Sequence, residues 1–126
     1  MSIIKITPRL VTADILTGEI ERRLSLGFDF DFEDERGVHH FGTTTKDMQR
    51  WAQEVTPLAQ AAMNMGQPDR LIAIKTETGL VSLAASEWWR VLDAATGRRQ
   101  SLYGSYFALK AMERVPTDYT SDNRWT

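Results

Sequence analysis

The chain has no cysteine, only two histidines and no long apolar run. Without cysteine, disulfides and thiolate metal ligands are excluded. No segment approaches the roughly 20 apolar residues that a membrane-spanning helix needs. The apolar run in the opening stretch MSIIKITPRL is too short for a signal peptide. We therefore expect no membrane partner and no targeting signal to another compartment.

An excess of positive charge is also missing. The chain has fifteen lysines and arginines and seventeen acidic residues, which gives a net charge of -2. Nucleic-acid-binding domains usually carry a basic excess, so we expect no nucleic-acid partner. The 126 residues fit one domain, and 42% hydrophobic and 25% charged residues are typical of a globular protein.

Residues 14–26 fit either a helix or a strand. As a helix, Thr17 would be the N-cap, and Ile20 and Leu24 would share one face. As a strand, the same two side chains share one parity. We favour a short helix that ends before Gly27.

The stretch GFDFDFEDERGVHHFG, residues 27–42, predicts a hairpin. Phenylalanines alternate with acids at the period of a half-buried strand, and DERG supplies turn residues. A two-residue loop at residues 35–36 would pair residue 30 with 41 and 32 with 39. The face predicted to be buried then holds Phe28, Phe30, Phe32, His39 and Phe41.

An alanine-rich helix follows, with threonines at residues 43–45 as candidate N-caps. Pro57 predicts a kink or a restart with Thr56 as the new cap, and Gly66 is placed to end the helix. The predicted apolar stripe is Met48, Trp51, Val55, Leu58 and Ala62.

A second hairpin comes next. A two-residue loop at residues 77–78 pairs Ile74 with Val81 and Ile72 with Leu83 on one apolar face. The elements together predict an α+β fold. Two short hairpins form a small antiparallel sheet, packed on the alanine-rich helix and a long C-terminal helix.

Ser86 is the predicted cap of that last helix, and Pro116 ends the helical pattern. Gly97 and Gly104 each cost about 1 kcal/mol relative to alanine, so we expect a break near residues 96–98. A continuous helix would be roughly 45 Å long. That is too long for one small domain to cover and indicates a neighbour.

Aromatic residues are the candidate contacts with such a neighbour. Two adjacent helical tryptophans diverge by about 100°, so both cannot lie fully in one core. One is expected under the second hairpin and the other against the first helix or a partner, with burial of both at the edges of a wide stripe as the alternative. The polar tail, residues 116–126, is expected to be mobile alone and to anchor another chain. The predicted partner-binding residues are Trp88, Trp89, Tyr103, Tyr119 and Trp125.

The acidic strand has the opening spacing of a calcium-binding EF-hand loop, but Asp34 stands where glycine is required. His40 occupies the position of the bidentate glutamate. His39 and His40 are expected on opposite faces of the strand. We favour a solvated strand face and expect no metal, no cofactor and no catalytic residue.

Three arginines, Arg90, Arg98 and Arg99, form a modest basic patch on the last helix. A nucleic acid is one candidate ligand for it. A solvated helix face or a protein partner is the favoured interpretation, because the chain has no overall basic excess.

The order of these motifs resembles a small domain family of bacteriophage tail and tail-fibre-associated proteins. In that family a Glu-Arg-rich helix leads into a Gly-Phe-x-Phe strand, and a short hairpin precedes the final helix. The resemblance covers roughly residues 19–112 and also supports a helix before Gly27. The matching residues are Glu21, Arg22, Arg23, Gly27, Phe28, Phe30, Gly79, Val81, Leu83 and residues 109–111.

The resemblance implies a structural component of the phage tail, in the baseplate or fibre attachment region, and no enzyme. An alternative is a tail-fibre assembly accessory, or a small metal-dependent or nucleic-acid-binding regulator. Implied partners are other tail proteins and further copies of the chain in three- or six-fold symmetry. The chain would be made in the bacterial cytoplasm and reside in the virion. We divide it into an arm (1–18), the tail-type domain (19–115) and a tail (116–126).

Overall fold

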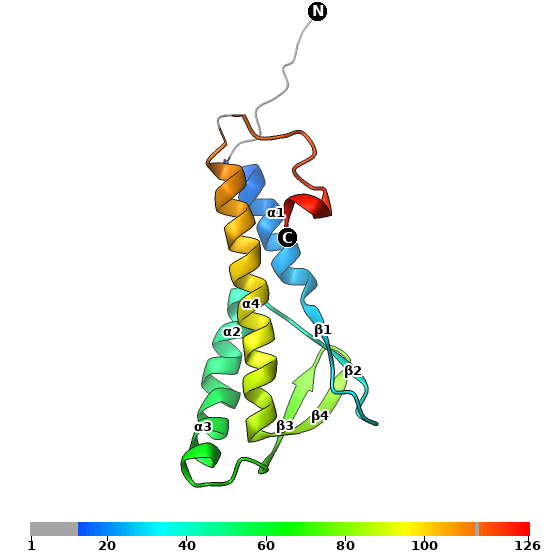
Figure 1. The fold of residues 1–126 in the computed structure, drawn as a ribbon, viewed down its shortest axis with the longest axis vertical. Helices are drawn as coiled ribbons and strands as arrows, with labels where there is room; N and C mark the ends of the chain where they lie inside the picture. The colour runs from blue at the N-terminus through cyan, green and yellow to red at the C-terminus, as the bar shows by residue number, and fades with distance from the viewer. Residues whose placement is uncertain (1–12, 113) are drawn as a thin grey trace, which may run out of the picture.

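The computed structural model describes residues 13–112 and 114–126, so residues 1–12 of the predicted arm lie outside the described part. One helix, α4 (Ala85–Lys110), runs the length of the described chain (Figure 1). Helix α1 lies beside its upper half, and the second helical segment and both hairpins lie around its lower half. The α+β class with a long C-terminal helix is confirmed.

Helix α1 spans Ala13–Leu26, which confirms the helix over the strand. Leu16, Ile20 and Leu24 are buried at a spacing of four residues. The helix begins before Thr17, so the predicted cap at this threonine is wrong. Its hydroxyl instead lies 3.0 Å from the Tyr106 hydroxyl of α4.

The first hairpin pairs β1 (Phe28–Asp31) with β2 (Val38–Phe41). Phe30 pairs with His39, two residues away from the predicted register, so the two-residue loop is wrong. The Phe32 amide donates to the carbonyl of Gly37 at 3.0 Å, which leaves a four-residue loop. Because a shift of two keeps each side chain on its face, the predicted buried face is retained.

The second helical segment consists of α2 (Thr45–Arg50), the π-helical turn η2 (Trp51–Val55) and α3 (Thr56–Asn64). Thr44 caps α2, since its hydroxyl accepts from the Asp47 amide at 3.1 Å.

The perturbation expected at Pro57 takes the form of the π turn, and Thr56 does not act as a side-chain cap. Ala59 joins Val55 and Ala62 on the buried side in place of Leu58, which is 49% exposed, and this corrects the prediction for Leu58.

The end of α3 is the glycine stop expected from sequence. Gly66 has a φ of 71°, which favours glycine. Its amide donates to Met63 at 3.1 Å, and the Gln67 amide donates to Ala62 at 2.8 Å. These two hydrogen bonds form a Schellman motif that satisfies the last carbonyls of the helix.

The second hairpin pairs β3 (Leu71–Thr76) with β4 (Gly79–Ala84). Its predicted two-residue loop and both predicted pairs, Ile74 with Val81 and Ile72 with Leu83, are confirmed. The two hairpins form two separate two-stranded sheets and not one. A backbone hydrogen bond of 3.0 Å from Glu77 to His40 joins the second turn to β2.

Helix α4 is continuous, so the predicted break is wrong. A Cβ added at Gly97 or Gly104 would meet no heavy atom within 4 Å, so these glycines face open space. The helix begins at Ala85, whose preceding residue donates its amide to Glu87 at 2.8 Å, and Ser86 is not the cap. It ends at Lys110, well before Pro116.

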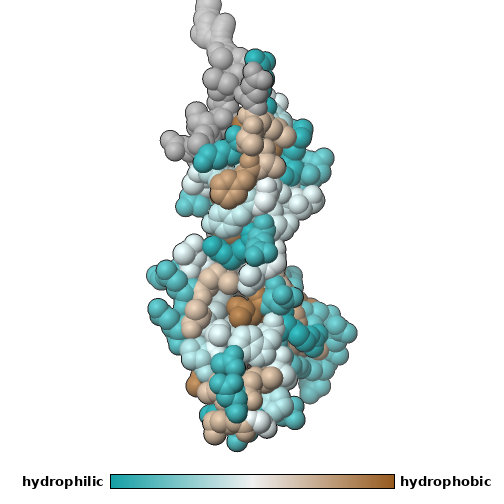
Figure 2. Space-filling model, turned by 60° about the vertical axis from the view of Figure 1, so that its left-hand side comes forward, coloured by the Kyte–Doolittle hydropathy of each residue, from teal (hydrophilic) through white to brown (hydrophobic). Residues whose placement is uncertain are grey.

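Two hydrophobic cores lie along α4, separated by a waist at residues 96–101 where no side chain is buried. Figure 2 shows this narrowing as a largely hydrophilic band. The first core is Phe32, Phe41, Trp51, Val55, Ala59, Ala62, Ile72, Ile74, Val81, Leu83, Ala85, Trp88 and Val91. The second core is Leu16, Ile20, Leu24, Leu102, Tyr106, Leu109 and Trp125.

The C-terminal segment folds back onto the upper half of α4, and a short 3-10 helix, η3 (Asp122–Arg124), precedes Trp125. Trp125 is only 5% exposed and completes the second core. The tail therefore anchors to its own chain in this structure, which corrects the expectation that it is mobile alone. It also removes the argument that α4 needs a neighbour to be covered. No helix in the described ranges has the length and apolar character needed to cross a bilayer.

Candidate functional site

The predicted tryptophan pair diverges as expected from adjacent helical positions. Trp88 is 1% exposed and lies 5.6 Å from the Trp51 ring, and its indole N–H donates to the Thr56 hydroxyl at 3.1 Å. It is a core residue, so the prediction of a surface anchor is corrected for Trp88. Trp89 is half-buried against the first core and keeps a surface.

The other three predicted residues belong to the second core. Tyr103 and Tyr119 are half-buried at its edge, with the Arg99 guanidinium 5.5 Å from the Tyr103 ring centre. Trp125 is in the interior and donates its indole N–H to the Tyr119 carbonyl at 2.6 Å. Of the five predicted residues, the structure therefore leaves Trp89, Tyr103 and Tyr119 with exposed surface.

The exposed sides of the two hairpins differ in chemistry. On β1, the exposed side carries Asp29 and Asp31, as is typical of a half-solvated antiparallel sheet. The exposed side of β3–β4, here called the outer face, carries two strongly exposed leucines, Leu71 at 69% and Leu80 at 71%. The residues of the outer face are Leu71, Ala73, Lys75, Leu80 and Ser82.

Sequence reasoning did not select this face. The signal was present, because Leu71 and Leu80 have the parity opposite to the core residues Ile72 and Val81. An apolar residue on the parity that should meet water is the pattern that identifies such a surface.

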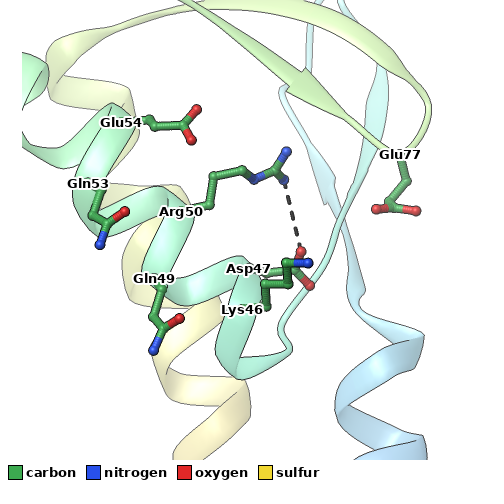
Figure 3. Close-up of a pocket in the computed structure, with 7 residues that line it drawn as sticks. All are labelled: Lys46, Asp47, Gln49, Arg50, Gln53, Glu54 and Glu77. Carbon is green, nitrogen blue, oxygen red and sulfur yellow. Dashed lines mark ion pairs between the residues drawn. The ribbon is translucent and has the colours of Figure 1, made fainter.

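A cleft of about 420 Å³ opens between the α2–η2 segment and the turn of the second hairpin (Figure 3). The Arg50 guanidinium lies 4.3 Å from the Trp51 ring centre, and its Nη2 is 4.0 Å from Asp47. Glu54 and Glu77 reach the cleft from its two sides. The full lining is Lys46, Asp47, Gln49, Arg50, Gln53, Glu54 and Glu77.

The lining of this cleft is suited to charged side chains of a partner. Its two cations and three carboxylates offer paired contacts of both signs, and the π turn contributes Gln53 and Glu54 to it. π turns are frequent at functional sites because they displace side chains from a regular helical face. The cleft can therefore bind a polar segment, whereas the outer face can bind an apolar one.

The two histidines lie on opposite faces of β2, as predicted. His39 Nδ1 is 3.2 Å from the Thr76 hydroxyl. His40 lies 2.7 Å from Asp29 through Nδ1 and 2.6 Å from the Leu26 carbonyl through Nε2. The hydrogen bond with Asp29 raises the pKa of His40, because both ring nitrogens face acceptors.

Within the part of the chain that the structure describes, no group of three or more His, Asp or Glu side chains is placed to hold a metal ion. Asp31 and Asp34 accept hydrogen bonds from loop amides, those of Glu33 at 2.8 Å and Arg36 at 2.9 Å. Two carboxylates of this stretch thus serve the turn itself.

The three arginines of the predicted basic patch are engaged within the chain. Arg98 donates to the Arg23 carbonyl at 2.6 Å, and Arg99 donates to the Thr43 carbonyl at 2.6 Å. Arg90 lies 5.7 Å from the Phe30 ring centre. Because two of the three guanidiniums donate hydrogen bonds to backbone carbonyls at the waist, these arginines stabilise the fold.

No protein-family model, curated protein or solved structure matches this chain. The resemblance to phage tail proteins therefore stays a prediction from the order of sequence motifs. The outer face and the charged cleft are the observations of this structure that bear on a binding function.

Proposed function

We propose that this chain is a structural protein of a bacteriophage tail, located in the baseplate or fibre attachment region, and that it acts by binding other protein subunits. The observation that carries the binding function is the pair of exposed leucines on the outer face, Leu71 and Leu80. The resemblance in motif order supplies the phage context. The proposed function needs neither a cofactor nor a catalytic residue.

Burial of the outer face would drive association. Full burial of a leucine side chain contributes about 1.5–3 kcal/mol, and Leu71 and Leu80 each keep more than two thirds of their surface exposed. Ala73 and Ser82 between them are small, so a partner can approach the strands closely. Lys75, which pairs with Leu80 at the turn end of the outer face, carries a positive charge that can orient a bound partner.

The partners proposed are other tail proteins and further copies of this chain, arranged around the three- or six-fold axis of a tail. The charged cleft beside the hairpin turn provides a second, polar contact area on the same lower half of the molecule. A polar rim beside an apolar centre is the usual anatomy of a specific interface.

Mass spectrometry of purified virions tests the proposed location. A structural tail protein is expected in the particle at a fixed copy number relative to other tail proteins. A chain that is made during infection but is absent from gradient-purified particles would contradict the proposal. A capsid protein and a non-structural phage protein serve as positive and negative references.

A further inference from the structure

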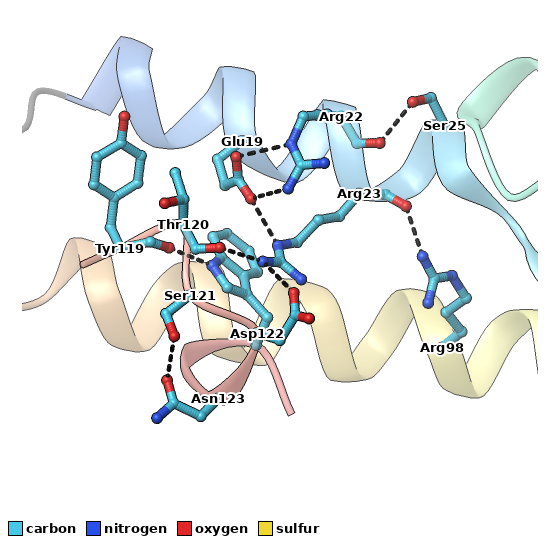
Figure 4. A network of polar contacts seen from close by, with 11 residues as sticks. Glu19, Arg22, Arg23, Ser25, Arg98, Tyr119, Thr120, Ser121, Asp122 and Asn123 are labelled. Carbon is cyan, nitrogen blue, oxygen red and sulfur yellow. Dashed lines mark hydrogen bonds and ion pairs between the residues drawn. The ribbon is translucent and has the colours of Figure 1, made fainter.

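The C-terminal segment is a small folded unit, residues 118–125, which we call the hook (Figure 4). Arg124 pairs with Asp118 at 3.1 Å. The Trp125 indole N–H donates to the Tyr119 carbonyl at 2.6 Å, and its amide donates to Asp122 at 3.0 Å. The hook therefore has internal hydrogen bonds of its own, and contacts with Arg23 and with the apolar residues of α1 and α4 complete its docking.

The surface that receives the hook is built by α1 and α4, and we call it the receptor groove. Its apolar floor is Leu16, Ile20, Leu24, Leu102, Tyr106 and Leu109. On its rim, the Arg23 side chain is 9% exposed and pairs with Glu19 at 2.7 Å. Glu19 in turn accepts from Arg22 at 2.8 Å, and this contact lowers the pKa of Glu19 and keeps it charged.

The polar recognition of the hook uses very few groups of the groove. Arg23 Nη2 donates to the Thr120 carbonyl at 2.7 Å and to Asp122 at 3.0 Å, and its guanidinium lies 5.2 Å from the Trp125 ring centre. Ser105 of α4 donates to the Thr126 carbonyl at 3.3 Å. Because Glu19 positions Arg23 from within α1, the groove is organised independently of the hook.

The connection between α4 and the hook is described at residues 111–112 and 114–117. The amides of Ala111 and Met112 bond to the end of α4, and among the described residues the next backbone hydrogen bond joins Ser121 to Asp118. Val115 packs at the edge of the second core. A hook and a groove that each carry internal hydrogen bonds, joined by a connecting segment, are the parts that domain exchange requires.

We propose that the hook is exchangeable between copies, so that the hook of one chain occupies the receptor groove of a second chain. Every contact of the hook with the groove would be reproduced between copies, since both chains carry the same residues. Exchange therefore costs mainly the entropy of association, which a high local concentration in an assembly reduces. The proposal stands on the C-terminal contacts and holds for any biological setting of the chain.

A peptide supplied from outside tests the receptor groove directly. The probe is a fluorescein-labelled peptide of residues 117–126, added to the full chain carrying Trp125→Ala, whose own hook lacks its anchor. Fluorescence anisotropy is expected to show saturable binding. The peptide is expected to bind the wild-type chain at least about tenfold more weakly, because the tethered hook competes for the groove at a high effective concentration.

Three controls define the outcome. A peptide with Trp125→Ala should not bind, and Arg23→Met added to the Trp125→Ala chain should weaken binding by about tenfold. Circular dichroism must show that the Trp125→Ala chain keeps its helices. Equal binding of the wild-type and Trp125→Ala peptides, or no binding to a folded Trp125→Ala chain, would overturn the proposal.

A second experiment keeps the native hook and decides the question if Trp125→Ala does not fold. The chain has no cysteine, so Ser105→Cys and Thr126→Cys can be made in separate copies and mixed under oxidising conditions. Exchange predicts disulfide-linked heterodimers well above those from Ser105→Cys mixed with Gln60→Cys, a position on the exposed side of α3. Yields no greater than this control would overturn the proposal.

Discussion

Arg99, in the middle of α4, donates from Nη1 to the backbone carbonyl of Thr43 at 2.6 Å. The preceding residue, Arg98, donates to the carbonyl of Arg23 in the last turn of α1 at 2.6 Å. Two neighbouring guanidiniums thus connect α4 by hydrogen bonds to α1, which belongs to the second core, and to the segment before α2, which leads into the first core. At the waist, charged hydrogen bonds replace the apolar packing that holds the rest of the molecule.

The Arg99 contact is expected to contribute measurably to stability. Arg99→Met removes a charged donor from the Thr43 carbonyl and should lower the free energy of unfolding by about 1–2 kcal/mol. Gln100→Met is the matched control, because this neighbouring side chain is exposed and should change stability by less than about 0.5 kcal/mol. Urea denaturation followed by circular dichroism measures both, and equal stabilities of the two variants would refute the role of Arg99.

His40 is expected to titrate above its ordinary pKa of 6.5. Its two ring nitrogens face Asp29 from β1 and the Leu26 carbonyl at the end of α1, and the charge of Glu77 in the second turn adds to their effect. Because the folded pKa is raised, the stabilisation is fully present below pH 6.5 and is lost as the pH rises through the folded pKa.

The titration of the His40 ring protons by NMR checks this prediction. Asp29→Asn should move the pKa of His40 downward, since it removes the largest cause of the shift. A His40 pKa at or below 6.5 in the wild-type chain would show that the two hydrogen bonds are not formed in solution.

Gly27 is expected to tolerate no side chain. It has a φ of 65°, and an added Cβ would overlap the Phe41 carbonyl and lie 2.8 Å from His40 Nε2. Gly27→Ala should therefore destabilise the fold by about 3 kcal/mol. Gly18→Ala, inside α1 with no atom within 4 Å, should instead stabilise it by about 0.5–1 kcal/mol. Thermal unfolding of the pair tests the opposite signs, and a shift in the same direction for both would contradict this account.

The second hairpin could be predicted in full because its two-residue loop and its apolar parity agree. In the first hairpin the apolar parity does not determine the length of the loop. Glu33 and Gly37 both adopt a positive φ, which permits a longer turn that an Asp-Glu-Arg-Gly sequence does not specify. Only the parity of the faces, which a shift of two preserves, could be predicted there.

The remaining differences come from contacts that local sequence does not contain. After Val55, helical spacing allows either Leu58 or Ala59 on the buried side, and tertiary packing buries Ala59. The docking of the C-terminal segment depends on a hydrogen bond between Arg23 and Thr120, 97 positions apart. A polar tail with two aromatics is compatible with docking on its own chain or on another, so the sequence could not decide between them.

The central claim is that the outer face of the second hairpin binds other subunits. Sedimentation velocity of the full chain from micromolar to millimolar concentration tests it most directly. The comparison uses the Leu71→Lys/Leu80→Lys variant and the control Val38→Lys, which places a lysine at an exposed position of the first hairpin. We predict that the wild-type and Val38→Lys chains associate more strongly than the double variant, in which exchange of the hook is the one proposed contact that is left between copies. A wild-type chain that stays monomeric, or a double variant that associates as strongly, would contradict the claim.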